Sequence, residues 1–168
     1  MKSADASSAS PSVNVPPIVR NKNVLIVDDA PSTRKILSRL LRNNGHTCHE
    51  ADNGAKALSA YIYCDAKAPF DVILMDYEMP VMNGPTATRI LRSLGYTNPI
   101  IGITGNVLPE DVIFFKSNGA NEVLAKPLKV PELEAVWGNV EVSYTVTTPE
   151  VEDTEVYRKI LSEKDGKV

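Results

Sequence analysis

Five short apolar segments occur between residues 23 and 127, and a stretch with helical spacing follows each of them. The segments are short and rich in Val, Ile and Leu, and turn residues bound them, which is typical of buried strands. Strict alternation of strands and helices with short connections predicts a parallel sheet with right-handed crossovers. The pattern therefore predicts an α/β fold, a doubly wound sheet of five parallel strands with helices on both faces.

Prolines and Asn-Gly clusters set the expected boundaries of these elements. Strands are expected at residues 24–27, 47–50, 72–75, 99–103 and 122–125. Helices are expected to begin near residues 31, 55, 85, 109 and 131. Residues 21–140 should therefore form one domain.

The two ends of the chain differ from this pattern. Residues 1–20 are rich in Ser, Ala and Pro and lack hydrophobic periodicity, which is typical of a flexible leader or linker. Residues 141–168 read as a tail, within which residues 150–164 either form an amphipathic helix or stay solvated.

Bulk composition limits the classes of function. With 43% hydrophobic and 23% charged residues the chain reads as globular, and its net charge of -3 gives no electrostatic reason to expect nucleic acid or a membrane surface as partner. No apolar run is long enough to span a bilayer, and the N-terminus lacks the apolar core of a secretory signal. A soluble protein of the cytosol or nucleus is expected on these grounds. Cys48 and Cys64 are isolated in sequence and are expected to be reduced.

Polar residues stand where the predicted strands stop. Asp28 and Asp29 follow the first strand and Asp76 the third, while Thr104 and Lys126 follow the fourth and fifth. Because the carboxyl ends of parallel strands share one edge of the sheet, these side chains should converge at a single site. A lone Asp after a strand is more often a turn residue or helix cap, but the set of five argues for a site.

Three converging carboxylates require a cation. A pair of like charges at about 4 Å repels by roughly 4 kcal/mol at a surface-like dielectric constant. With oxygen ligands and no His or Cys among them, the cation that fits is Mg²⁺. Such a site suits phosphoryl transfer to a carboxylate nucleophile, with Lys126 and Thr104 binding phosphoryl oxygens.

With these residues the sequence resembles a known family, the receiver domain of two-component response regulators. The similarity covers about residues 23–138 and is closest to the receivers of hybrid histidine kinases. It is carried by Asp28-Asp29, Met75-Asp76-Tyr77-Glu78-Met79-Pro80, Asn83-Gly84, Thr104-Gly105-Asn106 and the segment from Gly119 to Pro127.

The resemblance implies a flavodoxin-like sheet of strand order 2-1-3-4-5 and a role for each site residue. Asp76 would be the phospho-acceptor, with Thr104 and Lys126 contacting the phosphoryl group. Asp29, Asp76 and the backbone carbonyl of Glu78 would hold Mg²⁺, and Asp28 would act through a metal-bound water. The bond between Lys126 and Pro127 would be cis.

The resemblance also implies partners, a mode of action and a location. A cytoplasmic protein is expected, or the cytoplasmic part of a membrane-bound sensor kinase. The phosphoryl group would come from a phosphohistidine on a histidine kinase or histidine-phosphotransfer protein, and a downstream protein would bind the last two strand-helix units. No independent turnover is expected beyond Mg²⁺-dependent self-phosphorylation from a phosphodonor and slow autodephosphorylation. One departure is Val123, which stands where the family often has an aromatic residue that rotates on phosphorylation.

Two other functions fit parts of the pattern. A phosphatase of the haloacid dehalogenase class also uses an aspartyl nucleophile, but it needs a second Asp two residues later, where this chain has Glu78. A receiver-like docking module that does not depend on phosphorylation would not need the five site residues, all of which are present.

Overall fold

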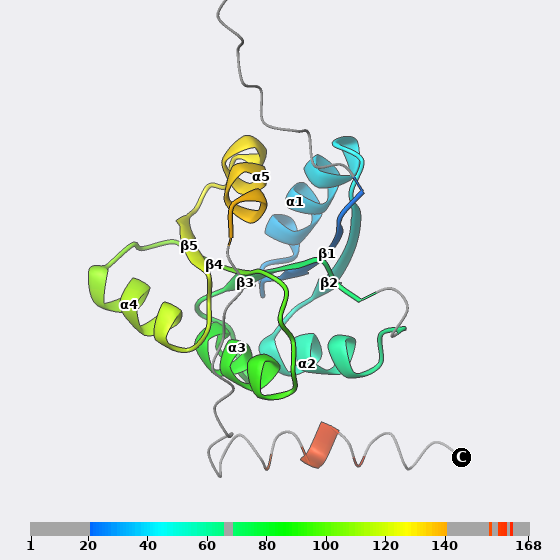
Figure 1. The fold of residues 1–168 in the computed structure, drawn as a ribbon, viewed down its shortest axis with the longest axis vertical. Coiled ribbons are helices and arrows are strands. Elements are labelled where there is room, and N and C mark those ends of the chain that lie inside the picture. Colours follow the sequence, from blue (N-terminus) through cyan, green and yellow to red (C-terminus); the bar gives the residue numbers. More distant parts are fainter. Residues whose placement is uncertain (1–20, 66–68, 141–154, 156–157, 161, 163–168) are drawn as a thin grey trace, which may run out of the picture.

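The computed structural model describes residues 21–65, 69–140, 155, 158–160 and 162. Within them the chain forms a five-stranded parallel sheet of order β2-β1-β3-β4-β5, with helices on both faces (Figure 1). The predicted fold class and strand order are confirmed. The predicted leader, residues 1–20, lies outside the described residues.

The observed strands begin and end, and the observed helices begin, within one residue of the expected positions. The strands are β1 (Asn23–Val27), β2 (Thr47–Ala51), β3 (Val72–Asp76), β4 (Ile100–Thr104) and β5 (Glu122–Ala125). The helices are α1 (Pro31–Asn43), α2 (Gly54–Ile62), α3 (Gly84–Ser93), α4 (Pro109–Ser117) and α5 (Val130–Gly138).

Two hydrophobic clusters lie on opposite faces of the sheet. Helices α1 and α5 cover one face, where Leu37 and Trp137 pack with Val24 and Ile26 of β1. Helices α2, α3 and α4 lie on the other face, as Figure 1 shows. Because β3 lies between β1 and β4 and is covered on both faces, all five of its residues are buried. The sheet therefore holds the residue at the end of β3 in a fixed place.

The register of the sheet brings the ends of four strands to one edge. Val27 lies opposite Met75, and Asp76 opposite Ile103. The backbone amide of Tyr77 donates to the carbonyl of Ile103 at 2.8 Å, so pairing continues one residue beyond β3. The residues that follow β1, β3, β4 and β5 consequently start from neighbouring positions.

Part of the C-terminal tail is described. Glu155, residues 158–160 and Ser162 are helical, and Ile160 packs against the cluster on the α2 side of the sheet. The hydroxyl of Tyr63 donates a hydrogen bond to the carbonyl of Ile160 at 2.9 Å. Among the described residues, no helix combines the length and apolar character that crossing a membrane requires.

Candidate functional site

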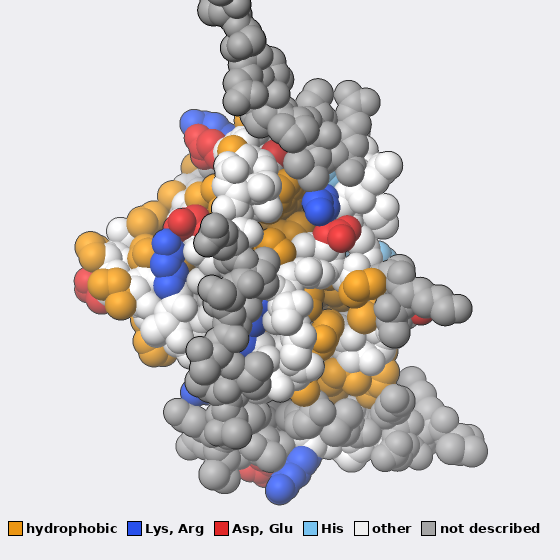
Figure 2. Space-filling model, viewed as in Figure 1, with side chains coloured by type: hydrophobic (Ala, Val, Ile, Leu, Met, Phe, Trp, Pro, Cys, Tyr) orange, Lys and Arg blue, Asp and Glu red, His pale blue; other side chains and the backbone are white. Residues whose placement is uncertain are grey.

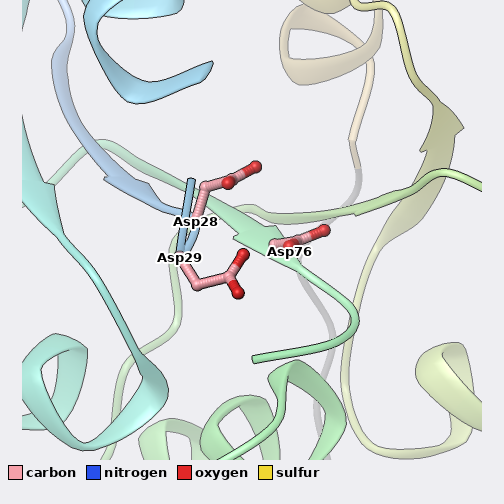
Figure 3. Close-up of side chains that lie close together, drawn as sticks. All are labelled: Asp28, Asp29 and Asp76. Carbon is pink, nitrogen blue, oxygen red and sulfur yellow. The ribbon is translucent and has the colours of Figure 1, made fainter. Parts of the chain in front are cut away.

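Three carboxylates meet at the carboxyl edge of the sheet (Figure 3). Asp28 and Asp29 lie in the loop between β1 and α1, and Asp76 is the last residue of β3. One carboxylate oxygen of each lies within 4.8 Å of the others. Asp28 and Asp76 are buried, whereas Asp29 is exposed. The cluster thus has two acids fixed inside the protein and one on the solvent side.

Lys126 bridges the two buried acids. Its Nζ lies 2.7 Å from Oδ2 of Asp28 and 2.9 Å from Oδ1 of Asp76. Burial by itself would lower the pKa of Lys126, but the hydrogen bonds that it donates to Asp28 and Asp76, together with their negative charges, outweigh burial and raise the pKa. The lysine is therefore a fixed positive charge between the acids. The peptide bond between Lys126 and Pro127 is cis.

The pKa of Asp76 is raised above that of an ordinary aspartate. The largest cause is burial, and the negative charge of Asp28 acts in the same direction, while the hydrogen bond from Lys126 opposes them. Asp76 is thus a carboxylate whose charge one lysine only partly neutralises. A second cation at this position would be favourable.

Thr104 lies at the same edge, but its hydroxyl is engaged within its own loop. It is buried, its Oγ1 donates to the carbonyl of Asn106 at 2.8 Å, and it accepts from the Asn106 amide at 3.2 Å. A hydrogen bond from Thr104 to a phosphoryl group on Asp76 would require the donation to Asn106 to break.

The loop between β3 and α3 is held tightly against Asp76. The Asn83 side chain caps α3 by accepting from the Thr86 amide, and the Gly84 amide donates to the carbonyl of Tyr77 at 2.9 Å. A Cβ on Gly84 would lie 2.0 Å from the carbonyl oxygen of Asp76. Only glycine allows the loop to return so close to the end of β3.

A cavity of about 670 Å³ opens over these residues. It has room for a hydrated cation and a phosphoryl group. Glu78 lines it but is not part of the carboxylate cluster. Its walls are formed by Asp29, Asp76, Tyr77, Glu78, Met79, Pro80, Thr104, Gly105, Asn106, Leu108, Asp111 and Lys126.

One pair in this wall did not follow from the sequence. The hydroxyl of Tyr77 donates to Oδ1 of Asp111 in α4 at 3.0 Å, and its ring packs edge-on against Phe115 at 5.5 Å. Val123 of β5, which stands where the family often has an aromatic residue, is a buried core residue. The aromatic contact between the end of β3 and α4 is therefore made by Tyr77, the residue directly after Asp76. The only sign of the pair of Tyr77 and Asp111 in the sequence is the position of Asp111, two residues after the proline that begins α4.

The raised pKa of Asp76 predicts the sign of a stability change. Above the ordinary pKa of an aspartate, ionised Asp76 favours the unfolded state, where it is solvated. Asp76→Asn should therefore stabilise the Mg²⁺-free protein at pH 7, by about 1 kcal/mol. The gain should shrink as the pH falls from the raised pKa of folded Asp76 toward about 4, and it should be absent below that pH, because Asp76 is then protonated in both states. Urea unfolding of Asp76→Asn and wild type at pH 7 and below pH 4 measures this difference in stability.

Asp52 provides a control of opposite sign. A hydrogen bond from Lys56 lowers the pKa of its carboxylate, so ionised Asp52 favours the folded state at neutral pH. Asp52→Asn should leave stability unchanged or reduce it at pH 7. If Asp76→Asn destabilised the protein at pH 7, the balance of charges described for Asp76 would be wrong.

Comparison with known proteins agrees with this geometry. Residues 24–137 match the model of the response regulator receiver domain. The chain belongs to this family. Its receiver domain is 38% identical over 115 residues to the two-component response regulator ORR41 of Oryza sativa, which covers 67% of this chain and 89% of the relative.

Other relatives of the receiver domain are longer proteins. Transcription factor SKN7 of Saccharomyces cerevisiae is 34% identical, with 79% of this chain and 21% of SKN7 covered. Sensor histidine kinase RcsC of Escherichia coli is 35% identical, with 76% of this chain and 13% of RcsC covered. The chain thus spans a small part of these two relatives.

Solved structures agree on the fold. The chemotaxis response regulator CheY4 of Vibrio cholerae superposes with a TM-score of 0.64 at 32% identity, over 72% of this chain and 99% of CheY4. The resemblance to receiver domains, including those of hybrid kinases, is confirmed.

Proposed function

We propose that this receiver domain accepts a phosphoryl group on Asp76 from a phosphohistidine of a histidine kinase or histidine-phosphotransfer protein. The observation that supports this most strongly is the carboxylate cluster of Asp28, Asp29 and Asp76, with Lys126 paired to two of its members. Asp76 is the member at the end of the central strand and in the wall of the cavity.

The residues present fit Mg²⁺. The cluster offers only oxygen ligands from carboxylates within 4.8 Å of one another, which suits a hard cation. Asp29, Asp76 and the backbone carbonyl of Glu78 would hold the ion, and Asp28 would act through a bound water. When bound, Mg²⁺ would neutralise negative charge on the transferring phosphoryl group.

The protein's own side chains would carry out the other parts of the phosphoryl transfer. An oxygen of Asp76 would form a bond to phosphorus as the bond between phosphorus and the donor imidazole nitrogen breaks. Lys126 would move from the acids to a phosphoryl oxygen, to which its ammonium can donate. Thr104 would exchange its hydrogen bond to Asn106 for one to the phosphoryl group.

Two exposed apolar surfaces suit the proposed partners. Beside the site, Ile36 and Leu40 of α1 are 62% and 43% exposed and line a groove that also includes Asp28 and Lys126, a position suited to a phosphodonor. On α4, the helix at the left of Figure 1, Ile113 and Phe114 are 67% and 53% exposed, and apolar side chains gather on the same side of the molecule in Figure 2. A downstream protein would bind this second surface, formed by the last two strand-helix units. A domain with these partners and a Mg²⁺ site would act in signalling in the cytoplasm.

A phosphodonor experiment tests the proposal. The full chain is incubated with acetyl phosphate and Mg²⁺, and its intact mass is measured. Wild type should gain one phosphoryl group, and Asp76→Asn should gain none because its amide is not a nucleophile. Asp71→Asn, which changes an acid at the opposite end of β3, should still be labelled. Labelling of Asp76→Asn, or release of phosphate from a generic ester at many turnovers, would contradict the proposal and favour a different phosphoryl chemistry.

A further inference from the structure

The side chain of Arg34 reaches from α1 back to the loop that carries two of the acids. Its Nη1 donates to the carbonyl oxygen of Asp28 at 2.6 Å and to that of Asp29 at 3.2 Å. Its Nε lies 3.5 Å from Oε2 of Glu50 in β2, and the side chain is only 15% exposed. One guanidinium therefore ties the acidic loop to both α1 and β2.

These contacts restrain the backbone of the acidic loop. Two consecutive carbonyls directed at one nitrogen fix the orientation of both peptide planes between residues 28 and 30. Asp28 is also held by its side chain, because its Oδ1 accepts from the Ala30 amide at 2.8 Å. Asp29 differs, since its exposed carboxylate makes no hydrogen bond within the described part of the chain. The direction in which the Asp29 side chain leaves the backbone thus depends on the carbonyl that Arg34 holds.

We propose that Arg34 is a positioning residue for the cation site. By binding the backbone carbonyls of Asp28 and Asp29 it orients their side chains toward Mg²⁺, and Glu50 holds its guanidinium in place. The proposal rests on the proposed function, in which these acids bind Mg²⁺. Groups that orient metal ligands without touching the metal typically change metal affinity by about 10- to 100-fold when removed. Arg34 has the planar fork of donors that this role requires.

The sign of the affinity change separates positioning from charge. Arg34 brings a positive charge to the loop that carries Asp28 and Asp29, so removing it would by electrostatics alone strengthen the binding of a cation there. Loss of a fixed ligand orientation would weaken binding instead. A fall in Mg²⁺ affinity on removal of a nearby positive charge is therefore specific to positioning.

Titration calorimetry of the full chain with MgCl₂ provides the test. Arg34→Gln should weaken Mg²⁺ binding about 10-fold, and Arg34→Lys, which keeps the charge but lacks the planar fork, should also weaken it, by less. Arg39→Gln is the matched control, since it removes the same charge from an exposed position of the same helix, and its affinity should stay within about twofold of wild type. Unchanged or tighter Mg²⁺ binding in Arg34→Gln would overturn the proposal; should that variant not fold, the same criterion applies to Arg34→Lys.

A second readout needs no metal. Amide hydrogen exchange in Mg²⁺-free protein should become faster at Ala30 in Arg34→Gln than in wild type or Arg39→Gln, because the loop loses its restraint. This difference is expected even if Asp76 is never phosphorylated, so failure of the proposed function and failure of this inference give different results. Equal exchange at Ala30 in all three proteins would contradict the restraint.

Discussion

Replacing Gly84 with alanine should destabilise the protein by about 3 kcal/mol or more, the largest effect expected from adding one methyl group. The added Cβ would lie 2.0 Å from the Asp76 carbonyl oxygen and 3.0 Å from Cζ of Phe115. Neither neighbour moves easily, because β3 is paired on both sides and Phe115 is fully buried. Relief requires the loop to move away from Asp76, so acceptance of a phosphoryl group should be lost along with stability.

Gly105 offers a matched control for this substitution. It lies in the wall of the same cavity, but a Cβ there would meet nothing within 4 Å. Gly105→Ala should change the free energy of unfolding by less than about 0.5 kcal/mol. Urea denaturation of both variants makes the comparison. Equal stability of Gly84→Ala and wild type would show that the loop does not pack on Asp76 as described.

Replacing Lys126 with methionine should have opposite effects on two properties of the site. The ammonium of Lys126 pairs with Asp28 and Asp76, so a cation must compete with it for their carboxylates. Its removal should strengthen Mg²⁺ binding about 10-fold, equivalent to about 1.4 kcal/mol. The rate of phosphorylation by acetyl phosphate should nevertheless fall about 100-fold, because a donor to the phosphoryl oxygens is lost. Calorimetry and intact mass spectrometry measure the two effects on the same samples.

Lys129 provides the comparison for Lys126. It is exposed, lies three residues further along the chain, and pairs only with Glu132 among the described residues. Lys129→Met should leave both Mg²⁺ affinity and phosphorylation rate near those of wild type. A Lys126→Met protein that binds Mg²⁺ less tightly would contradict the competition between lysine and cation.

The meeting of Asp28, Asp29 and Asp76 at one edge could be predicted because it depends on the parallel topology alone. Once the alternating pattern implied a parallel sheet, Asp28 and Asp76 had to leave their strands at the same edge of the sheet, whatever their rotamers. The element boundaries could be predicted from prolines and Asn-Gly clusters because these residues restrict the backbone locally. Strand order came from the resemblance to a family, since periodicity alone does not distinguish one order of parallel strands from another.

Contacts between side chains distant in sequence were beyond the same reasoning. Arg34 reads as an ordinary charge in the first turn of a helix, and only the path of the loop shows that it binds two carbonyls. The hydrogen bond from Tyr77 to Asp111 spans 34 positions and depends on where α4 packs. The sequence marked Gly84 as part of a turn, but the steric need for glycine arises from the backbone of Asp76 beside it.

Mapping the phosphate is the most direct test of the central claim, that Asp76 accepts a phosphoryl group in a Mg²⁺-dependent reaction. Protein treated with acetyl phosphate is reduced with borohydride, which converts an aspartyl phosphate to homoserine, and is then digested and sequenced by mass spectrometry. Homoserine should appear at position 76, and only when Mg²⁺ was present. Homoserine at position 28 or 29, phosphate on a Ser, Thr or His side chain, or equal labelling of Asp76 without Mg²⁺ would contradict the account.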